Sequence, residues 1–150
     1  MFELIENIKE NTILNIKWKE YKVIAKVKYV TEKETSKRYA KIQLENHYVL
    51  VIAPYDNYMY FGHVGEQFPC KFPAPNTIEY KWKTYSKDSE DYQIVKEFVF
   101  GNMLNMEWEV QYTDFSNWNS LISLGIIKRT NERADVYAET IELKDVLLIK

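Results

Sequence analysis

Hydrophobic and polar residues alternate along most of the chain, and this period of two is typical of half-buried β-strands. The clearest case is residues 21–30, where Tyr21 and Val23 share one face and Lys22 and Lys28 share the other. Other runs with strand-like patterns cover residues 12–16, 39–44, 48–53, 58–64, 78–85, 92–100, 134–139 and 145–150. We therefore expect an all-β or β-dominated protein of about ten short antiparallel strands.

The second half of the chain contains a predicted β-hairpin, EWEVQYTDFSNWNSLISLGII (107–127). Its first seven residues alternate, and its last eight are apolar enough to be buried on both faces. Between them lies DFSNWN (114–119), whose Asp, Ser and Asn side chains bond nearby backbone and tolerate tight turns. We expect the hairpin loop here, with Phe115 and Trp118 in it.

One short helix is expected near the N-terminus. Phe2, Leu4, Ile5 and Ile8 recur at close to helical spacing within residues 2–10. The alternative is an irregular segment that leads into the first strand.

The two halves of the chain, residues 12–66 and 78–149, carry similar strand patterns. The matching segments are 21–30 with 92–101, 40–44 with 108–112, and 48–53 with 121–126. Residues 67–77 between the halves hold three of the four prolines, and proline is excluded from central strands. We therefore predict a single domain, 1–150, in which two similar antiparallel meanders or half-barrels share one core and are joined by a proline-rich crossover. The alternative is that amphipathic strands resemble one another without a repeat.

Composition excludes classes of function without identifying one. The 150 residues are 46% hydrophobic and 28% charged, which is ordinary for a folded domain. The net charge of −2 argues against a nucleic-acid partner. Aromatic rings together with Lys22, Lys26 and Lys28 would nevertheless suit single-stranded nucleic acid. The single cysteine excludes an internal disulfide framework and indicates a reducing compartment. No apolar run approaches the ~18–20 residues of a membrane span, and no signal-peptide pattern is present, so a cytoplasmic location is expected.

Few groups in the sequence suit catalysis or metal binding. His47 and His63 are the only histidines, and no HxxxH or CxxC spacing predicts a metal site. An enzyme would have to use Cys70 with an imidazole, or Glu107 and Glu109 on one strand face. A packed thiol and a solvated strand face explain these residues better. We therefore expect a non-catalytic protein without a metal or cofactor.

Aromatic residues, 15% of the chain, carry the first functional hypothesis. Tyr55 and Tyr58 surround a turn, and Phe115 and Trp118 lie in the predicted hairpin loop. Rigid, amphipathic rings of this kind are favoured at recognition surfaces. We therefore predict a binding module that recognises a protein partner through these loops.

A second hypothesis places aromatic rings inside the molecule. A small-ligand carrier would hold its ligand in the cavity of a β-barrel, and Tyr60, Trp82 and Trp108 are the residues expected to line it. The first hypothesis places its rings on the surface, whereas this one requires a closed pocket.

Several stretches resemble a known family. They are YKVIAKVKY (21–29), YAKIQLENHYVLVI (39–52), YMYF (58–61), VKEFVFGN (95–102), EWEVQYTDF (107–115), LISLGI (121–126) and RADVYAETIELKDV (133–146). Together they are similar to the bacterial domain-of-unknown-function family 4178, over about residues 12–149. The resemblance implies a bacterial origin. It implies no activity and no catalytic residues, because the family has no established function to transfer.

Overall fold

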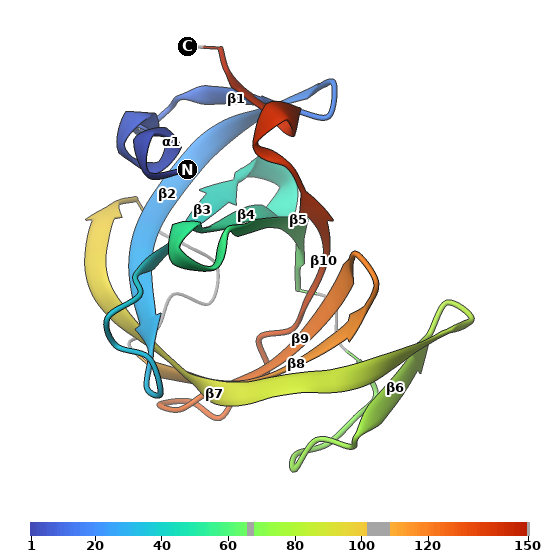
Figure 1. Ribbon diagram of the computed structural model, residues 1–150. Coiled ribbons are helices and arrows are strands. Elements are labelled where there is room, and N and C mark those ends of the chain that lie inside the picture. Colours follow the sequence, from blue (N-terminus) through green and yellow to red (C-terminus); the bar gives the residue numbers. More distant parts are fainter. Residues whose placement is uncertain (66–67, 102–108, 150) are drawn as a thin grey trace.

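Eight antiparallel strands close into a barrel within residues 1–65, 68–101 and 109–149, which are the residues that the computed structural model describes (Figure 1). In order around the wall they are β2 (Lys19–Thr31), β3 (Tyr39–Leu44), β4 (Tyr48–Ala53), β5 (Tyr58–Val64), β10 (Val136–Ile141), β9 (Ser120–Ile127), β8 (Glu109–Asn117) and β7 (Lys83–Phe100). The ring closes because β7 also pairs with β2. The expected β-dominated fold with one short N-terminal helix is confirmed.

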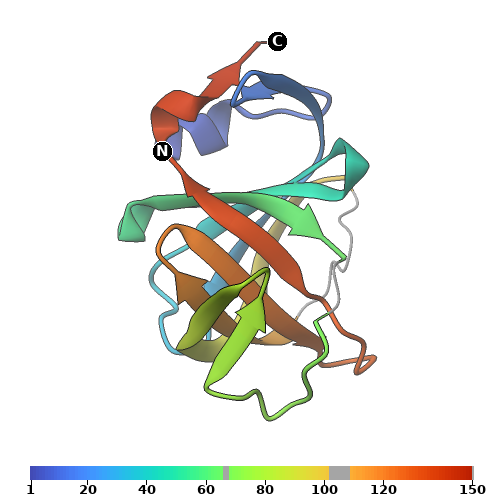
Figure 2. The ribbon, with the colours of Figure 1, turned by 90° about the vertical axis from the view of Figure 1, so that its right-hand side faces the viewer.

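Shorter elements extend or cover the barrel wall. They are the helix α1 (Phe2–Asn7), the strands β1 (Ile13–Ile16), β6 (Thr77–Tyr80) and β11 (Val146–Leu148), and the 3-10 turns η1 (Glu45–His47), η2 (Pro54–Asp56) and η3 (Leu143–Asp145). β1 pairs with the start of β2 and with β11, while β6 pairs with the start of β7. Figure 2 shows α1, β1 and β11 together at one end of the molecule.

The two half-barrels follow one another in the same strand order. β2, β3, β4 and β5 form one half, β7, β8, β9 and β10 form the other, and the seams between the halves are β2–β7 and β5–β10. β1 flanks β2 as β6 flanks β7. The segments matched in the sequence fall on β2 and β7, on β3 and β8, and on β4 and β9. That the halves arose by duplication stays a prediction.

The largest hydrophobic cluster lies on the outside of the barrel wall. It joins alternate residues of the wall, such as Ile42, Leu50 and Met59, to Ile5 of α1 and Leu14 of β1. A second cluster packs outward-facing residues of β8 and β9 against the segment that leads into β6, and it comprises Phe68, Ile78, Tyr85, Phe115, Ile122 and Leu124. Because side chains alternate between the two faces of a strand, the residues between these apolar ones point into the barrel. A third, smaller cluster of Val27, Tyr29 and Val95 faces the interior, and polar side chains line much of the remaining space.

Lys26 shows how the covering elements are held to the wall. Its side chain is buried on the outer face of β2, and its ammonium donates hydrogen bonds of 2.8 Å to the carbonyl oxygens of Ile5 and Ile8 at the end of α1. A cation is favourable there because these carbonyls have no partner within the helix. On the same face, the ammonium of Lys28 lies 3.2 Å from the carboxylate of Glu6.

Residues 78–85 do not form the single strand predicted from their alternation. A turn at Lys81 and Trp82 separates β6 from β7, and both residues have positive φ, 48° and 67°. Two consecutive positive φ values are the pattern of a type I′ hairpin turn, which usually contains Asn or Gly. The turn here is Lys-Trp and contains neither Asn nor Gly, so no local pattern predicted it.

Candidate functional site

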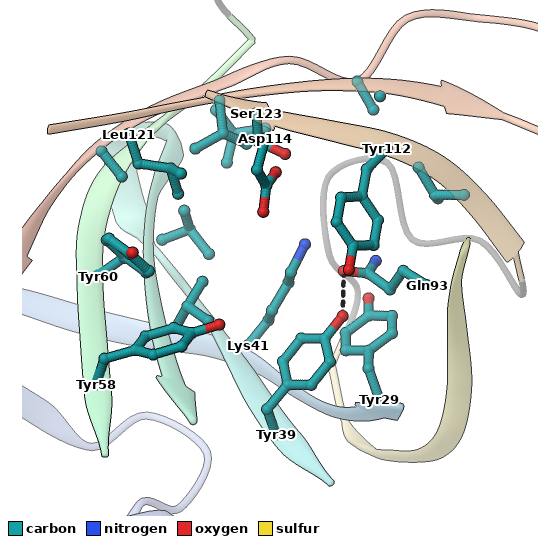
Figure 3. Close-up of a pocket in the computed structure, with 18 residues that line it drawn as sticks. Tyr29, Tyr39, Lys41, Tyr58, Tyr60, Gln93, Tyr112, Asp114, Leu121 and Ser123 are labelled. Atoms are coloured by element: carbon teal, nitrogen blue, oxygen red, sulfur yellow. Dashed lines mark hydrogen bonds between the residues drawn. The ribbon is translucent and has the colours of Figure 1, made fainter. Parts of the chain in front are cut away.

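The barrel encloses a cavity of about 120 Å³. Its wall combines small apolar residues with polar side chains from β2, β3, β5, β7, β8 and β9 (Figure 3). The polar residues are Tyr29, Tyr39, Lys41, Tyr58, Tyr60, Gln93, Tyr112, Asp114 and Ser123. Two opposite charges and five phenol groups therefore face one cavity.

Strand alternation places these side chains inside. Tyr39 and Lys41 flank outward-facing Ala40 on β3, and Tyr112 and Asp114 lie two apart on β8. In the same way Tyr58 and Tyr60 of β5 point inward on either side of Met59, which belongs to the outer cluster.

Asp114 is the negative group of the cavity. Its Oδ1 atom is buried and accepts no hydrogen bond from the residues described. Burial raises the pKa of Asp114 to about 6, and the nearby Asp88 acts in the same direction. A hydrogen bond from Ser123 and the charge of Lys41 oppose this rise. At neutral pH the carboxylate is therefore mainly ionised, although its hydrogen-bonding capacity is only partly used.

Lys41 is the positive group. Its ammonium lies 5.4 Å from the centre of the Tyr29 ring, and no described residue accepts a hydrogen bond from it. Burial lowers the pKa of Lys41 to about 8, and the attraction of Asp114 opposes the change. Because this pKa is still above neutral pH, the amine is mainly protonated. Lys41 and Asp114 attract each other across the cavity, but these two described side chains form no direct ion pair.

The tyrosines supply neutral hydrogen-bonding groups. Burial raises the pKa of Tyr29, Tyr39, Tyr58 and Tyr112 well above the ordinary value, so their hydroxyls stay protonated. The Tyr39 hydroxyl donates a 2.8 Å hydrogen bond to Oε1 of Gln93. A phenol can donate one hydrogen bond and accept others, so the wall can meet both kinds of polar group on a ligand.

The residues predicted to bind a partner are not gathered in one loop patch. Tyr58 lines the cavity and is 38% exposed, whereas Tyr55 lies outside on η2 with its ring against Phe2. Trp118 occupies the β8–β9 turn and is 98% exposed. The placement of Phe115 in a loop was wrong, because β8 continues to Asn117 and Phe115 is fully buried in the second hydrophobic cluster.

The three residues predicted to line a cavity have different positions. Tyr60 points into the barrel interior. Trp82 does not line it, because the turn at Lys81 and Trp82 leaves the indole entirely exposed, at 104%. Trp108 lies outside the described residues.

The catalytic candidates are not assembled into a site. Cys70 packs against the second hydrophobic cluster, and burial raises the pKa of its thiol, which disfavours the nucleophilic thiolate. His47 and His63 instead stack on each other with ring centres 6.2 Å apart. Glu109 pairs with the Lys128 ammonium at 3.0 Å, while Glu107 is outside the described residues. In the part of the chain that the structure describes, no group of three or more His, Cys, Asp or Glu side chains could hold a metal ion.

The charged centre of the cavity was missed in the sequence. Asp114 was interpreted as the start of a turn, although it lies within a strand. Lys41 resembles the other lysines that alternate with apolar residues, and only closure of the barrel shows that it points inward. One shared feature could have indicated the site: each charged residue follows a tyrosine by two positions, Lys41 after Tyr39 and Asp114 after Tyr112, so each pair shares one strand face.

None of the described helices is long and apolar enough to cross a membrane. Comparison of the chain with protein-family models, with curated proteins and with solved structures finds no match. The resemblance to family 4178 therefore stays a prediction, and the functional argument depends on the geometry of the barrel.

Proposed function

We propose that this protein binds a small polar molecule inside its barrel. The observation that carries the proposal is the pair of opposite charges, Lys41 and Asp114, which face the same cavity without pairing directly. Buried polar groups are normally satisfied, and desolvated charges are costly unless they are paired. Groups that break this rule concentrate at functional sites.

The construction of the wall supports this proposal. The cavity-lining side chains project from strands of a closed sheet, which hold them more rigidly than loops would. The cavity of about 120 Å³ is smaller than the roughly 300–1,000 Å³ of sites for drug-sized ligands. A compact ligand fits this interior better than a lipid or a large cofactor.

Filling the cavity tests the proposal. Val51 lies between Lys41 and Tyr60 in the strand register and faces inward, so Val51→Phe places a ring in the ligand space. We expect saturation-transfer NMR with a library of polar fragments to show binding to the wild type and its loss in this variant. Glu139→Phe, on the outer face of β10, is the control and should keep binding. Equal fragment binding by wild type and a folded Val51→Phe protein would contradict an interior site.

A second candidate is recognition of a protein partner, which the exposed indoles favour. Trp118 and Trp82 lie on adjacent hairpins, and the Asn117 side chain donates a 2.8 Å hydrogen bond to the carbonyl oxygen of Thr84. Both tryptophans have positive φ, as Trp18 has, because each lies in a tight turn between paired strands. The proximity of Trp118 and Trp82 distinguishes them from Trp18. The cytoplasmic, non-catalytic role expected from the sequence stays a prediction for either candidate.

Trp118→Ala tests this second candidate. We expect partner capture in a pulldown to be lost with this variant and kept with Trp18→Ala, an equally exposed indole on the β1–β2 hairpin. A captured protein that is unaffected by Trp118→Ala would contradict a role for this hairpin.

A further inference from the structure

The two charges of the cavity come from well-separated strands of the wall. Lys41 is on β3 and Asp114 is on β8, with β2 and β7 between them on one side of the barrel and four strands on the other. Figure 3 shows the Lys41 side chain extending toward Asp114 from the opposite side of the cavity. A ligand between them would meet a cation on one side and an anion on the other.

Charge balance restricts what that ligand is. A simple cation would pair with Asp114 and leave Lys41 both unpaired and repelled, and a simple anion would do the reverse. A neutral molecule would lie between the two charges without giving either of them a directly contacting partner of opposite sign. A molecule that carries both signs satisfies both groups and leaves the interior neutral.

The aromatic groups give the ligand an orientation. Burial raises the pKa of Tyr58, Tyr60 and Tyr112, and each phenol is also close enough to Asp114 for its charge to add to that rise. A carboxylate among aromatic rings is a favourable environment for an ammonium group. On the other side, the Lys41 ammonium lies beside Tyr29, and Lys41 shares its strand face with Tyr39. A buried cation beside an aromatic ring suits a carboxylate or another anion.

The cavity volume limits the ligand to a compact molecule. The cavity measures about 120 Å³, and an engineered cavity of about 150 Å³ holds a molecule the size of benzene. A zwitterion of roughly five to eight non-hydrogen atoms fits this space by the same comparison.

Resting on the proposed ligand binding, we infer that the ligand of the barrel is a compact zwitterion of the amino-acid type. Its cationic nitrogen contacts the Asp114 carboxylate among the tyrosine rings, and its anionic group contacts the Lys41 ammonium. Neither group forms a covalent bond with the ligand.

Calorimetric titration with matched probes tests this inference. The zwitterions are glycine, alanine, proline, β-alanine, γ-aminobutyrate and taurine, and each is compared with analogues that lack one charge, such as propionate and ethylamine for alanine. We expect at least one zwitterion to bind the wild type about tenfold or more tightly than either of its analogues. Asp114→Asn should remove the preference for the zwitterion over the anion, and Lys41→Met should remove its preference over the amine. Lys22→Met, an exposed lysine of β2, should change neither.

The outcomes separate this inference from the proposed function. In one outcome, polar fragments bind the wild type but not Val51→Phe, and zwitterions bind no better than their analogues. This outcome would overturn the zwitterion inference and support the interior site. Zwitterion binding that survives both Asp114→Asn and Lys41→Met would also overturn it. An absence of any fragment or zwitterion binding would reject both.

Discussion

Asp114→Asn is expected to make the unliganded protein more stable at neutral pH. In the folded protein burial raises the pKa of Asp114 from the ordinary value of 3.8 to about 6. The free energy of unfolding of the variant should exceed that of the wild type by an amount that grows by about 2–3 kcal/mol between pH 4 and pH 7. Asparagine keeps the shape of the side chain while removing the buried charge.

The sign follows from proton binding. Because its folded pKa is raised, Asp114 binds its proton more tightly in the folded protein than in the unfolded chain. The stability that the protonated group contributes is fully present below pH about 4 and is lost as the pH rises through about 6. The Asp114→Asn variant has no titratable group at this position. Its free energy of unfolding therefore rises above that of the wild type as the pH increases from about 4 through about 6.

Urea unfolding at pH 4, 5, 6 and 7, followed by circular dichroism, measures this difference. Glu139→Gln removes an exposed carboxylate from the outer face of β10 and is the control. The difference in the free energy of unfolding between Glu139→Gln and the wild type should stay nearly constant from pH 4 to pH 7. If the wild type is more stable than Asp114→Asn at pH 7, the Asp114 carboxylate stabilises the folded protein, and this result would contradict its assignment as a ligand-binding group.

Gly62→Ala is expected to cause a large loss of stability. Gly62 lies on β5 at the seam with β10, opposite Ala138. A Cβ atom at this position would overlap with the carbonyl oxygen of Tyr137 and would lie 2.5 Å from the Cα and Cβ atoms of Ala138. These are mainly backbone atoms, so relief requires β5 and β10 to separate. We expect a loss of about 3 kcal/mol or more from overpacking and broken ladder hydrogen bonds.

Thermal and urea unfolding of Gly62→Ala measure this loss. Gly65→Ala is the comparison, because no atom lies within 4 Å of the added methyl group and only the positive φ of 101° opposes it. That variant should lose about 1–2 kcal/mol. If Gly62→Ala unfolds within 1 kcal/mol of the wild type, the seam is looser than its contacts indicate.

The sequence predicted the strands but not how they close. Alternation located most strands correctly, because a strand with one buried face has apolar residues at every second position. The β2–β7 and β5–β10 seams join residues far apart in the chain, and long-range pairing leaves no local pattern. Closure also decides which face of each strand is interior. For that reason Lys41 looked like any surface lysine.

The errors at Trp82 and Phe115 have local causes. Lys81 and Trp82 form a turn without the residues that usually mark one, so Trp82 was assigned to a strand. Phe115 was assigned to a loop because Asp114, Ser116 and Asn117 resemble turn residues. In the structure, β8 continues through this polar run because β7 and β9 pair with it on both sides. Tertiary pairing overrides local preference here.

The position of the two larger hydrophobic clusters on the outer face of the wall has a consequence for how such a molecule can change. The contacts between the wall and its outer covering stabilise the fold. The residues that point into the barrel take little part in these contacts. Mutations that change the lining can then alter what the barrel binds while the contacts between the wall and its outer covering stay in place. The same shell is a suitable starting point for engineering receptors with new selectivity.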